Sequence, residues 1–322
     1  MKIQSLDHLP RPACRLVSSA FGQAVRVEGL AADHLRHLFG AGGQPFRWDE
    51  LQSIDALDIC LETGGEKEPD GYSLDIDRAD GRVSTVSGGP ARVRVGPGHQ
   101  LQDDRFPESL ALALAQQWAR AGLWVLHAAG IVVRSQGHVL LGDKGRGKST
   151  LTALALAVGG QAVSDDWLLF GLDSDDRLCM ERMRGFFMLR NGWAADRIVT
   201  GAGVGYRPHA DRPKQILSTR GNLRRMPPVA TVDRIWTLQR RRGWPRYSET
   251  ASTSLAHTVT ALIAGSMPIL FSGRFPEERV RLQGVLESLS DRIEVGVLRP
   301  GLDIVDFSLG TETRLVTLLE SR

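Results

Sequence analysis

The chain has 322 residues, 40 Lys+Arg against 37 Asp+Glu, and a formal net charge of +3. Its hydrophobic fraction of 42% and charged fraction of 24% are ordinary for a folded chain and exclude wholesale disorder. No apolar run approaches the roughly 20 residues of a membrane span, and Met1–Arg11 lacks the apolar core of a signal peptide. We therefore expect a cytoplasmic protein with no membrane partner. At about 100–200 residues per domain, the length predicts two domains or one large one.

Residues 1–100 predict a small β-rich domain, which we expect to serve recognition or assembly. Short apolar and β-branched stretches alternate there with turns that contain Gly, Asp and Pro. A helix over 31–39 and a hairpin turn at Asp80–Gly81 are also expected. The expected strands are Gln23–Glu28, Ala56–Glu62, Tyr72–Ile76 and Ala91–Val95.

Residues 101–322 predict a second, α/β domain, which begins at the end of a linker over 96–104. Pro107 suits the first position of a helix, on which Leu110, Leu114 and Trp118 share one face. Further strands are expected over Trp124–Val133, His138–Leu141, Trp167–Gly171, Leu178–Arg182, Val232–Gln239 and Asp291–Leu298. Further helices are expected over Ser149–Val158, Ser254–Ala264, Pro276–Ser288 and Thr311–Ser321. A turn is expected at Ser135–Gly137, and the Gly-, Pro- and Arg-rich residues 196–230 indicate a mobile surface segment.

The three cysteines, Cys14, Cys60 and Cys179, lie far apart and form no CxxC pair. They cannot build a disulfide framework. We expect buried free thiols; a cysteine nucleophile is an alternative that nothing else in the sequence supports.

Residues Gly142–Ser149, with the sequence GDKGRGKS, match the phosphate-loop pattern G-x-x-x-x-G-K-[ST]. The pattern requires a strand before it and a helix after it, and the stretches His138–Leu141 and Ser149–Val158 are expected to supply both. It therefore predicts a binding site for the phosphates of a nucleotide. The alternative is a glycine-rich turn that merely joins a strand to a helix.

The residue types of this loop suit a phosphate. Glycines let backbone amides wrap closely round phosphate oxygens, and the N-terminus of the following helix adds its dipole. Lys148 offers the β- and γ-phosphates a compact point charge, although only five of the 40 Lys+Arg residues are lysines. Ser149 offers a hydroxyl to Mg²⁺, whereas Lys144 and Arg146 either contact phosphates or are simply loop charges. The expected nucleotide-binding residues are Gly142, Asp143, Lys144, Gly145, Arg146, Gly147, Lys148, Ser149 and Thr150.

An aspartate pair, Asp165–Asp166, follows Lys148 by 17 residues, at the end of a short apolar stretch. Adjacent residues of an extended strand point to opposite sides. One carboxylate can then bind Mg²⁺ while the other accepts the proton of an acceptor hydroxyl, which are the two roles that a kinase needs. The alternative is a solvated acidic turn, which we expect at Asp175–Asp176, between two strands.

The block Leu126–Phe170 resembles the HPr kinase/phosphorylase family. That family has a histidine shortly before a strand–turn–strand, then the phosphate loop and its helix, and then a short strand that ends in a paired aspartate at this spacing. The resemblance implies a P-loop kinase core like that of HPr kinase and phosphoenolpyruvate carboxykinase, with a mixed sheet. It also implies ATP- and Mg²⁺-dependent phosphorylation of a serine.

The resemblance also assigns roles to individual residues. Lys148 and Ser149 would hold the nucleotide and the metal. Asp165 would be the base and Asp166 the Mg²⁺ ligand, or the two roles are reversed. His127 corresponds to the family's histidine near the phosphate site; the alternative is a core histidine at a strand edge.

Two later stretches bear on the substrate. Arg184–Gly185 fits a further signature of the family, but Glu181 stands one place early and Phe187 replaces the second glycine, so phosphorolysis is not implied. Residues 1–100 show no match to the family's N-terminal domain, so HPr itself is not implied as the substrate.

A closer resemblance is to divergent HPr-kinase-like proteins found beside peptide-modification genes, some of which phosphorylate a serine of a ribosomally made peptide precursor. The chain shares with them the opening Leu126–Ala129, and Leu189–Asn191 looks like their Leu-Lys-Asn motif. The residues expected to contact substrate or phosphate are Arg184, Arg190 and Asn191.

The small net charge hides a basic segment over residues 182–246, with 15 Lys+Arg against three acids, or +12. Three interpretations remain open. These charges bind ATP phosphates, attract an acidic peptide or protein, or form a solvated face or an oligomer contact. No recognisable nucleic-acid-binding module accompanies them, so we expect no nucleic-acid partner.

The sequence therefore predicts a kinase that transfers the γ-phosphate of ATP to a serine hydroxyl of a peptide or protein, with Mg²⁺ as cofactor. One alternative is a kinase for a small hydroxyl compound, such as free serine or a sugar. Another is a nucleotide-binding regulator with little turnover. The family resemblance also makes a homo-oligomer plausible.

Overall fold

The computed structural model describes parts of a chain that divides into two compact units. The first unit comprises residues 1–39 and 46–121, and the second comprises residues 40–45 and 122–322. In the first unit the described residues are 13–17, 21, 24–28, 47–50, 59–63, 76–78, 81–85, 91–95, 115 and 118. In the second unit they are 122–183, 186–190, 207–208, 214–218, 225–239, 245–265, 276–305 and 310–320. The domain boundary expected between residues 100 and 101 stays a prediction.

The first unit contains a seven-stranded sheet with the order β3-β1-β2-β4-β7-β6-β5. Its strands are β1 (Ala13–Val17), β2 (Ala24–Glu28), β3 (Arg47–Glu50), β4 (Ile59–Thr63), β5 (Ile76–Arg78), β6 (Gly81–Thr85) and β7 (Ala91–Val95). β4 runs parallel to both of its neighbours, and the other pairs are antiparallel. The described residues of this unit are thus rich in strands, as the sequence indicates, although β1, β3 and β6 were not expected.

Other expectations for the first unit are tested only in part. Gly81 pairs with Arg78 as the first residue of β6, so it is not part of the hairpin turn expected at Asp80–Gly81, and Asp80 lies outside the described residues. Ala115 and Trp118 are helical and buried, in agreement with the helix expected after Pro107. The helix over 31–39 and the linker over 96–104 lie outside the described residues.

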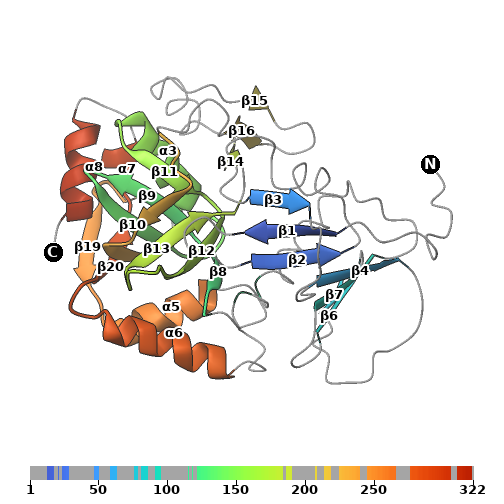
Figure 1. Cartoon of the computed structure of the whole chain (residues 1–322). Coiled ribbons are helices and arrows are strands. Elements are labelled where there is room, and N and C mark those ends of the chain that lie inside the picture. Colours follow the sequence, from blue (N-terminus) through green and yellow to red (C-terminus); the bar gives the residue numbers. More distant parts are fainter. Residues whose placement is uncertain are drawn as a thin grey trace. The chain divides into compact units, whose positions relative to one another are not determined.

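A six-stranded sheet with the order β11-β9-β10-β18-β20-β19 organises the second unit (Figure 1). Its strands are β9 (Ala129–Val133), β10 (Gln136–Leu141), β11 (Gln161–Ser164), β18 (Arg234–Leu238), β19 (Glu249–Ser252) and β20 (Glu294–Arg299). β10, β18 and β20 run parallel to one another, whereas β9, β11 and β19 are antiparallel to their neighbours. The expected α/β class with a mixed sheet is therefore confirmed.

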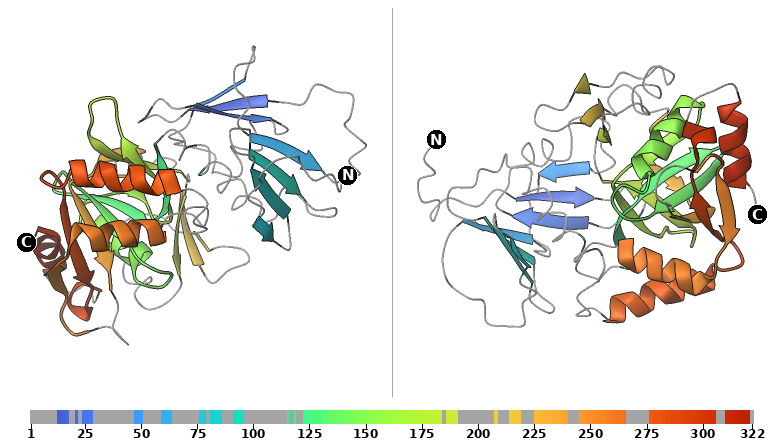
Figure 2. Two further views of the ribbon diagram at one scale, coloured as in Figure 1. Left: turned by 90° about the horizontal axis from the view of Figure 1, so that it is seen from below. Right: turned by 180° about the vertical axis from the view of Figure 1, so that it is seen from behind.

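Helices pack against both faces of this sheet. On one face lie α3 (Lys148–Ala157), α7 (Leu302–Val305) and α8 (Thr311–Glu320), whose apolar side chains share a core with Leu140 of β10. On the other face lie α5 (Leu255–Gly265) and α6 (Pro276–Ser288), which share a core with Val139 and Leu141 (Figure 2). Successive residues of β10 thus enter opposite cores, which explains why the whole of this strand after its first residue is buried.

A four-stranded antiparallel sheet, β17-β13-β12-β8, packs on the same side as α5 and α6. Its strands are β8 (Trp124–His127), β12 (Trp167–Leu172), β13 (Leu178–Arg182) and β17 (Val229–Thr231). The hairpin between β12 and β13 contains the acidic turn expected at Asp175–Asp176, where Asp176 has a φ of 56°.

The expectation of one strand over Trp124–Val133 is wrong. The chain leaves the four-stranded sheet after His127 and enters the six-stranded sheet at Ala129, with Ala128 completely buried between them. The two sheets approach closely there, because a Cβ at Gly130 would lie 2.6 Å from the sulfur of Met180. The break is invisible in the sequence because both halves of the run are apolar and buried.

The expected turn at Ser135–Gly137 is also displaced. The connection between β9 and β10 is Arg134–Ser135, with φ angles of 48° and 66°, which is typical of a two-residue hairpin turn. Gly137 instead belongs to β10, where a Cβ would lie 1.8 Å from the carbonyl oxygen of Thr231. This glycine is therefore required for a close approach of two backbones and not for a turn.

The mobile surface segment expected over 196–230 is wrong for the described residues of that range. β16 (Lys214–Ser218) lies between β14 (Phe186–Arg190) and β15 (Arg207–Pro208) in a three-stranded antiparallel sheet. Met226 is completely buried. The pairing of β16 with β14 joins residues at least 24 positions apart in the chain, so no local periodicity indicates it.

The remaining helices of the second unit agree with the sequence to within a residue or two at each end, and α7 was not expected. Cys179 is a buried free thiol, as expected, whereas the side chains of Cys14 and Cys60 lie outside the described residues. In the described parts of the chain, no helix is long and apolar enough to cross a membrane.

Candidate functional site

The glycine-rich loop lies between β10 and α3, as the motif requires. Gly142, Gly145 and Gly147 have φ angles of 148°, 86° and 106°, in the region that side chains disfavour. At Gly142 a Cβ would also lie 3.2 Å from Leu238, so the loop passes closely over the end of β18. Gly147 caps the helix, and its carbonyl accepts the N–H of Leu151 at 2.9 Å. The glycines thus shape a loop that turns directly into a helix N-terminus.

Lys148 begins this helix and is 94% buried by accessible area, with 6% exposed. Its ammonium donates hydrogen bonds to the backbone carbonyls of Gly142 and Asp143, the latter at 3.4 Å. Burial lowers the pKa of Lys148 from its ordinary value of 10.5, while the carboxylates of Asp166, Asp143 and Asp165, in that order, act to raise it. The charged amine is thus enclosed by the loop and has the aspartate pair within electrostatic range.

The other charged residues of the loop are more exposed. Asp143 and Arg146 form an ion pair at 3.3 Å, and 82% of the Asp143 side chain is exposed. Lys144 is exposed, whereas Ser149 and Thr150 in the first turn of α3 are half-buried. At such an exposed site an ion pair contributes little to stability.

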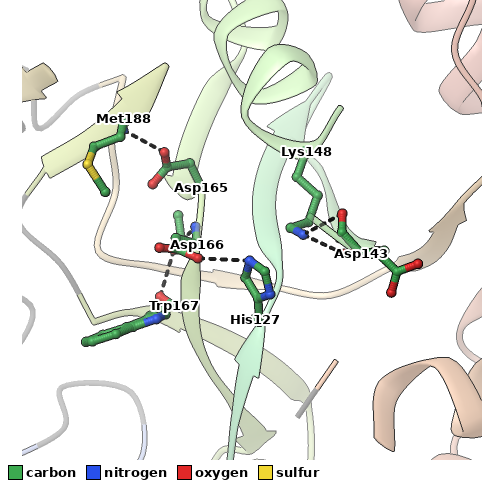
Figure 3. Close-up of polar contacts among 9 residues, drawn as sticks. His127, Asp143, Lys148, Asp165, Asp166, Trp167 and Met188 are labelled. Carbon is green, nitrogen blue, oxygen red and sulfur yellow. Dashed lines mark hydrogen bonds and ion pairs between the residues drawn. The ribbon is translucent and has the colours of Figure 1, made fainter. Parts of the chain in front are cut away.

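The aspartate pair lies in the short connection between β11 and β12. The Ser164 hydroxyl donates to the carbonyl of Trp167 at 2.7 Å, and the amide of Asp166 donates to the Ser164 oxygen at 3.4 Å. Figure 3 shows that the two carboxylates point in different directions, Asp165 toward Met188 and Asp166 toward His127. The divergence expected of adjacent residues is therefore present.

Asp165 is buried, with 5% exposed, and its Oδ2 accepts the backbone N–H of Met188 in β14 at 2.6 Å. Asp166 is more open, with 26% of its side chain exposed, and its Oδ1 lies 3.1 Å from Nε2 of His127. His127 is the last residue of β8 and pairs in register with Trp167 at the start of β12. Because the two strands are neighbours, this pairing brings the histidine beside the aspartate that precedes Trp167.

Four predicted site residues therefore share one region: His127, Lys148, Asp165 and Asp166 (Figure 3). Of the predicted substrate contacts, Arg184 and Asn191 lie outside the described residues, and only the backbone of Arg190 is described, at the end of β14. The contact made by Met188 was not anticipated, because it uses a backbone N–H and no motif signals it.

Several cations of the basic segment have structural roles. Arg182 is completely buried and donates to the carbonyl of Met226 at 3.0 Å. Arg225 donates to the carbonyl of Leu156 in α3. Arg234 is 6% exposed and pairs with Glu294 at 2.8 Å. These three arginines hold the second unit together, so the segment's excess of +12 is not wholly available to a ligand.

The residues present fit a nucleotide. The loop offers closely wrapped backbone, a helix N-terminus and an enclosed ammonium, which together are the donor set for a polyphosphate. Ser149 and Asp166 offer oxygen ligands of the kind that Mg²⁺ prefers. No group of three His, Cys, Asp or Glu that could hold a metal ion alone occurs among the described residues. A magnesium ion at this site would complete its shell with phosphate oxygens and water, its usual arrangement.

Comparisons with known proteins assign no family to this chain, so the geometry of the site is the basis for proposing a function. No family model matches the chain, and a search of curated proteins finds no significant match.

Proposed function

We propose that this protein is a P-loop kinase, with a core like that of HPr kinase and phosphoenolpyruvate carboxykinase. It transfers the γ-phosphate of ATP to a serine hydroxyl of a peptide or protein. Two observations together carry the proposal. Lys148 is enclosed by a glycine-rich loop, and the carboxylate of the more exposed Asp166–His127 pair lies close enough to counter the lowering of that lysine's pKa by burial. A protein that only binds a nucleotide does not need a carboxylate–histidine pair beside its phosphate loop.

Each group has a part in such a transfer. Lys148 and the loop amides bind and orient the phosphates, and Ser149 with Asp166 holds Mg²⁺. ATP supplies the phosphoryl group, and Mg²⁺ neutralises charge that develops on it. A carboxylate of the pair accepts the proton of the serine hydroxyl as the new O–P bond forms, while the bond from the γ-phosphorus to the bridging oxygen breaks and ADP leaves. Enclosure of Lys148 strengthens its attraction to a phosphate, because the surrounding dielectric is low.

A peptide or protein acceptor is favoured by charge near the site. β14 and β16 carry Arg190 and Lys214 at paired register positions, and the two strands contain no acid. An acidic segment around the serine would suit these strands, because basic residues bind carboxylates. A ribosomally made peptide precursor is one such substrate.

The nucleotide site is tested by measuring MgATP affinity by calorimetry. We expect Lys148→Ala to weaken binding by about 100-fold, the order expected when a charge-assisted hydrogen bond in an enclosed site is lost. Lys144→Ala removes an exposed cation from the same loop and should weaken binding much less. Equal affinity of Lys148→Ala and wild type would refute the nucleotide site itself.

Transfer is tested with γ-labelled ATP and two sets of acceptors: serine-bearing acidic peptides, and free serine and sugars. The proposal expects label on a peptide serine, located by mass spectrometry, and its loss in Asp166→Asn. Label on a small hydroxyl compound alone would identify the acceptor class as wrong. Tight MgATP binding without transfer to any acceptor would favour a regulatory protein instead.

A further inference from the structure

The two aspartates of the pair differ in exposure and in hydrogen-bond partner. Asp165 is 5% exposed, and its carboxylate oxygen lies 2.6 Å from a backbone N–H, a short, charge-assisted hydrogen bond. Asp166 keeps 26% of its side chain exposed and faces His127, of which 42% is exposed. One carboxylate is therefore held inside the protein, while the other lies where a solute can reach it.

The partner of Asp165 belongs to a strand that forms the wall of the site. Phe187 and Leu189 of β14 are buried in two apolar clusters that include residues of α3. Met188, between them, pairs with Ile216 of β16, yet its N–H donates to Asp165 and not into that pair. In an antiparallel ladder, N–H groups of alternate residues point away from the partner strand. The edge of β14 that faces away from β16 is thus turned toward the aspartate pair.

This arrangement links the site to the three-stranded sheet of β14, β16 and β15. β14 is joined to β16 and, through it, to β15, and these strands contain Arg190, Arg207 and Lys214. The hydrogen bond from the Met188 N–H to the Asp165 carboxylate ties β14 to the β11–β12 connection. A shift of β14 would move the whole sheet relative to Lys148 and Asp166.

We infer that Asp165 is a positioning residue, which anchors β14 and its sheet beside the phosphate loop. Of the two aspartates, Asp166 is the one that contacts the reacting groups, together with its partner His127. This inference rests on the proposed function and deepens it by dividing the roles of the two carboxylates. Asp165 thus fixes the sheet that positions the acceptor peptide. Asp166 supplies the negative charge that the transfer requires.

Three variants of the full chain separate these roles. Asp165→Asn removes the charge but keeps an oxygen that accepts the Met188 N–H; Asp165→Ala removes both. Asp166→Asn removes the charge of the open carboxylate. For each we measure kcat and the KM of the acceptor peptide that is labelled most strongly by wild type, and the hydrogen exchange of residues 186–190 by mass spectrometry.

The inference predicts that Asp165→Ala raises the acceptor KM about tenfold and speeds exchange of the Met188 amide by roughly tenfold or more, the order expected for loss of one charged hydrogen bond. Asp165→Asn restores both values toward those of wild type. Asp166→Asn lowers kcat about 100-fold or more, because the open carboxylate carries the charge that binds Mg²⁺ or accepts the proton, with little change in exchange.

Two results would overturn the inference. A loss of kcat in Asp165→Asn as large as that in Asp166→Asn would mean that the chemistry uses the charge of Asp165. Equal exchange of the Met188 amide in wild type and Asp165→Ala would mean that this aspartate does not anchor β14. If wild type transfers no phosphate at all, the proposed function fails, while the exchange measurement still decides whether Asp165 anchors the strand.

Discussion

Replacing Gly137 by alanine tests how β10, the strand that leads into the phosphate loop, is seated. An added Cβ would lie 1.8 Å from the carbonyl oxygen of Thr231, and real Cβ contacts essentially never fall below 3.0 Å. The two backbones must therefore separate by at least 1.2 Å, the difference between these distances. Neither atom belongs to a flexible side chain, so the strain cannot be relieved locally.

Such a separation breaks two hydrogen bonds. The Gly137 N–H donates to the Asp233 carboxylate at 2.7 Å, and the Asp233 N–H donates to the Gly137 carbonyl at 2.8 Å. At roughly 2 kcal/mol for the charged bond and 1 kcal/mol for the neutral one, Gly137→Ala should lower the free energy of unfolding by about 3 kcal/mol. For a unit of this size, the expected fall in Tm is roughly 6–12 °C.

The assay is urea unfolding of the full chain, followed by the fluorescence of its buried tryptophans. Gly284→Ala is the matched control: it makes the same chemical change inside α6, where nothing lies within 4 Å of the added Cβ. Because alanine is the better helix former, the control should raise the free energy of unfolding by about 0.5–1 kcal/mol. A decrease below 1 kcal/mol in Gly137→Ala would refute the close approach of β10 to Thr231.

Three further predictions concern buried polar groups. His138 accepts the indole N–H of Trp236 at 3.2 Å, and burial, with Arg234, lowers its pKa from 6.5 to about 4. The contribution of this neutral histidine to the free energy of unfolding should therefore be complete above pH 6.5 and decrease as the pH falls toward 4. Urea titrations should show a weaker pH dependence in His138→Gln. Burial, with the Asp173 carboxylate, raises the pKa of Cys179 to about 12. Iodoacetamide should therefore modify this thiol at pH 8 only after unfolding, as followed by mass spectrometry, and labelling of the native chain would contradict this prediction. Arg234 pairs with Glu294 and donates to the carbonyl of Leu319 in α8, so Arg234→Ala should speed amide exchange in α8 but not in α6; equal acceleration in both helices would argue against this local anchor.

The phosphate loop is the part of the site that the sequence predicts best. Its glycines, lysine and serine have fixed spacing, and the flanking apolar and Ala/Leu-rich stretches indicate a strand and a helix by local periodicity alone. β10 and α3 lie within two residues of the expected ranges. Local rules suffice because the loop, the strand end and the helix start are contiguous in the chain.

The strand break and the role of Gly137 show where local rules fail. An apolar run such as Trp124–Val133 is equally compatible with one strand or two, because only the packing of two sheets requires the chain to cross at Ala128. Gly137 resembles a turn residue until Thr231, 94 residues later, is seen to occupy the space of its Cβ. In both cases the cause is a contact between residues distant in the chain.

The aspartate pair combines both kinds of information. The amino-acid sequence alone indicates that Asp165 and Asp166 are adjacent and follow a short strand. Their divergence arises in the bend between β11 and β12 and not along extended backbone. Which carboxylate is enclosed and which is open follows from the packing of distant strands. Met188 and His127 lie 23 and 39 residues away from their partners, and the pairing of β8 with β12 and the packing of β14 on α3 bring them there. Such contacts depend on the packing of whole strands, which no local pattern in the sequence encodes.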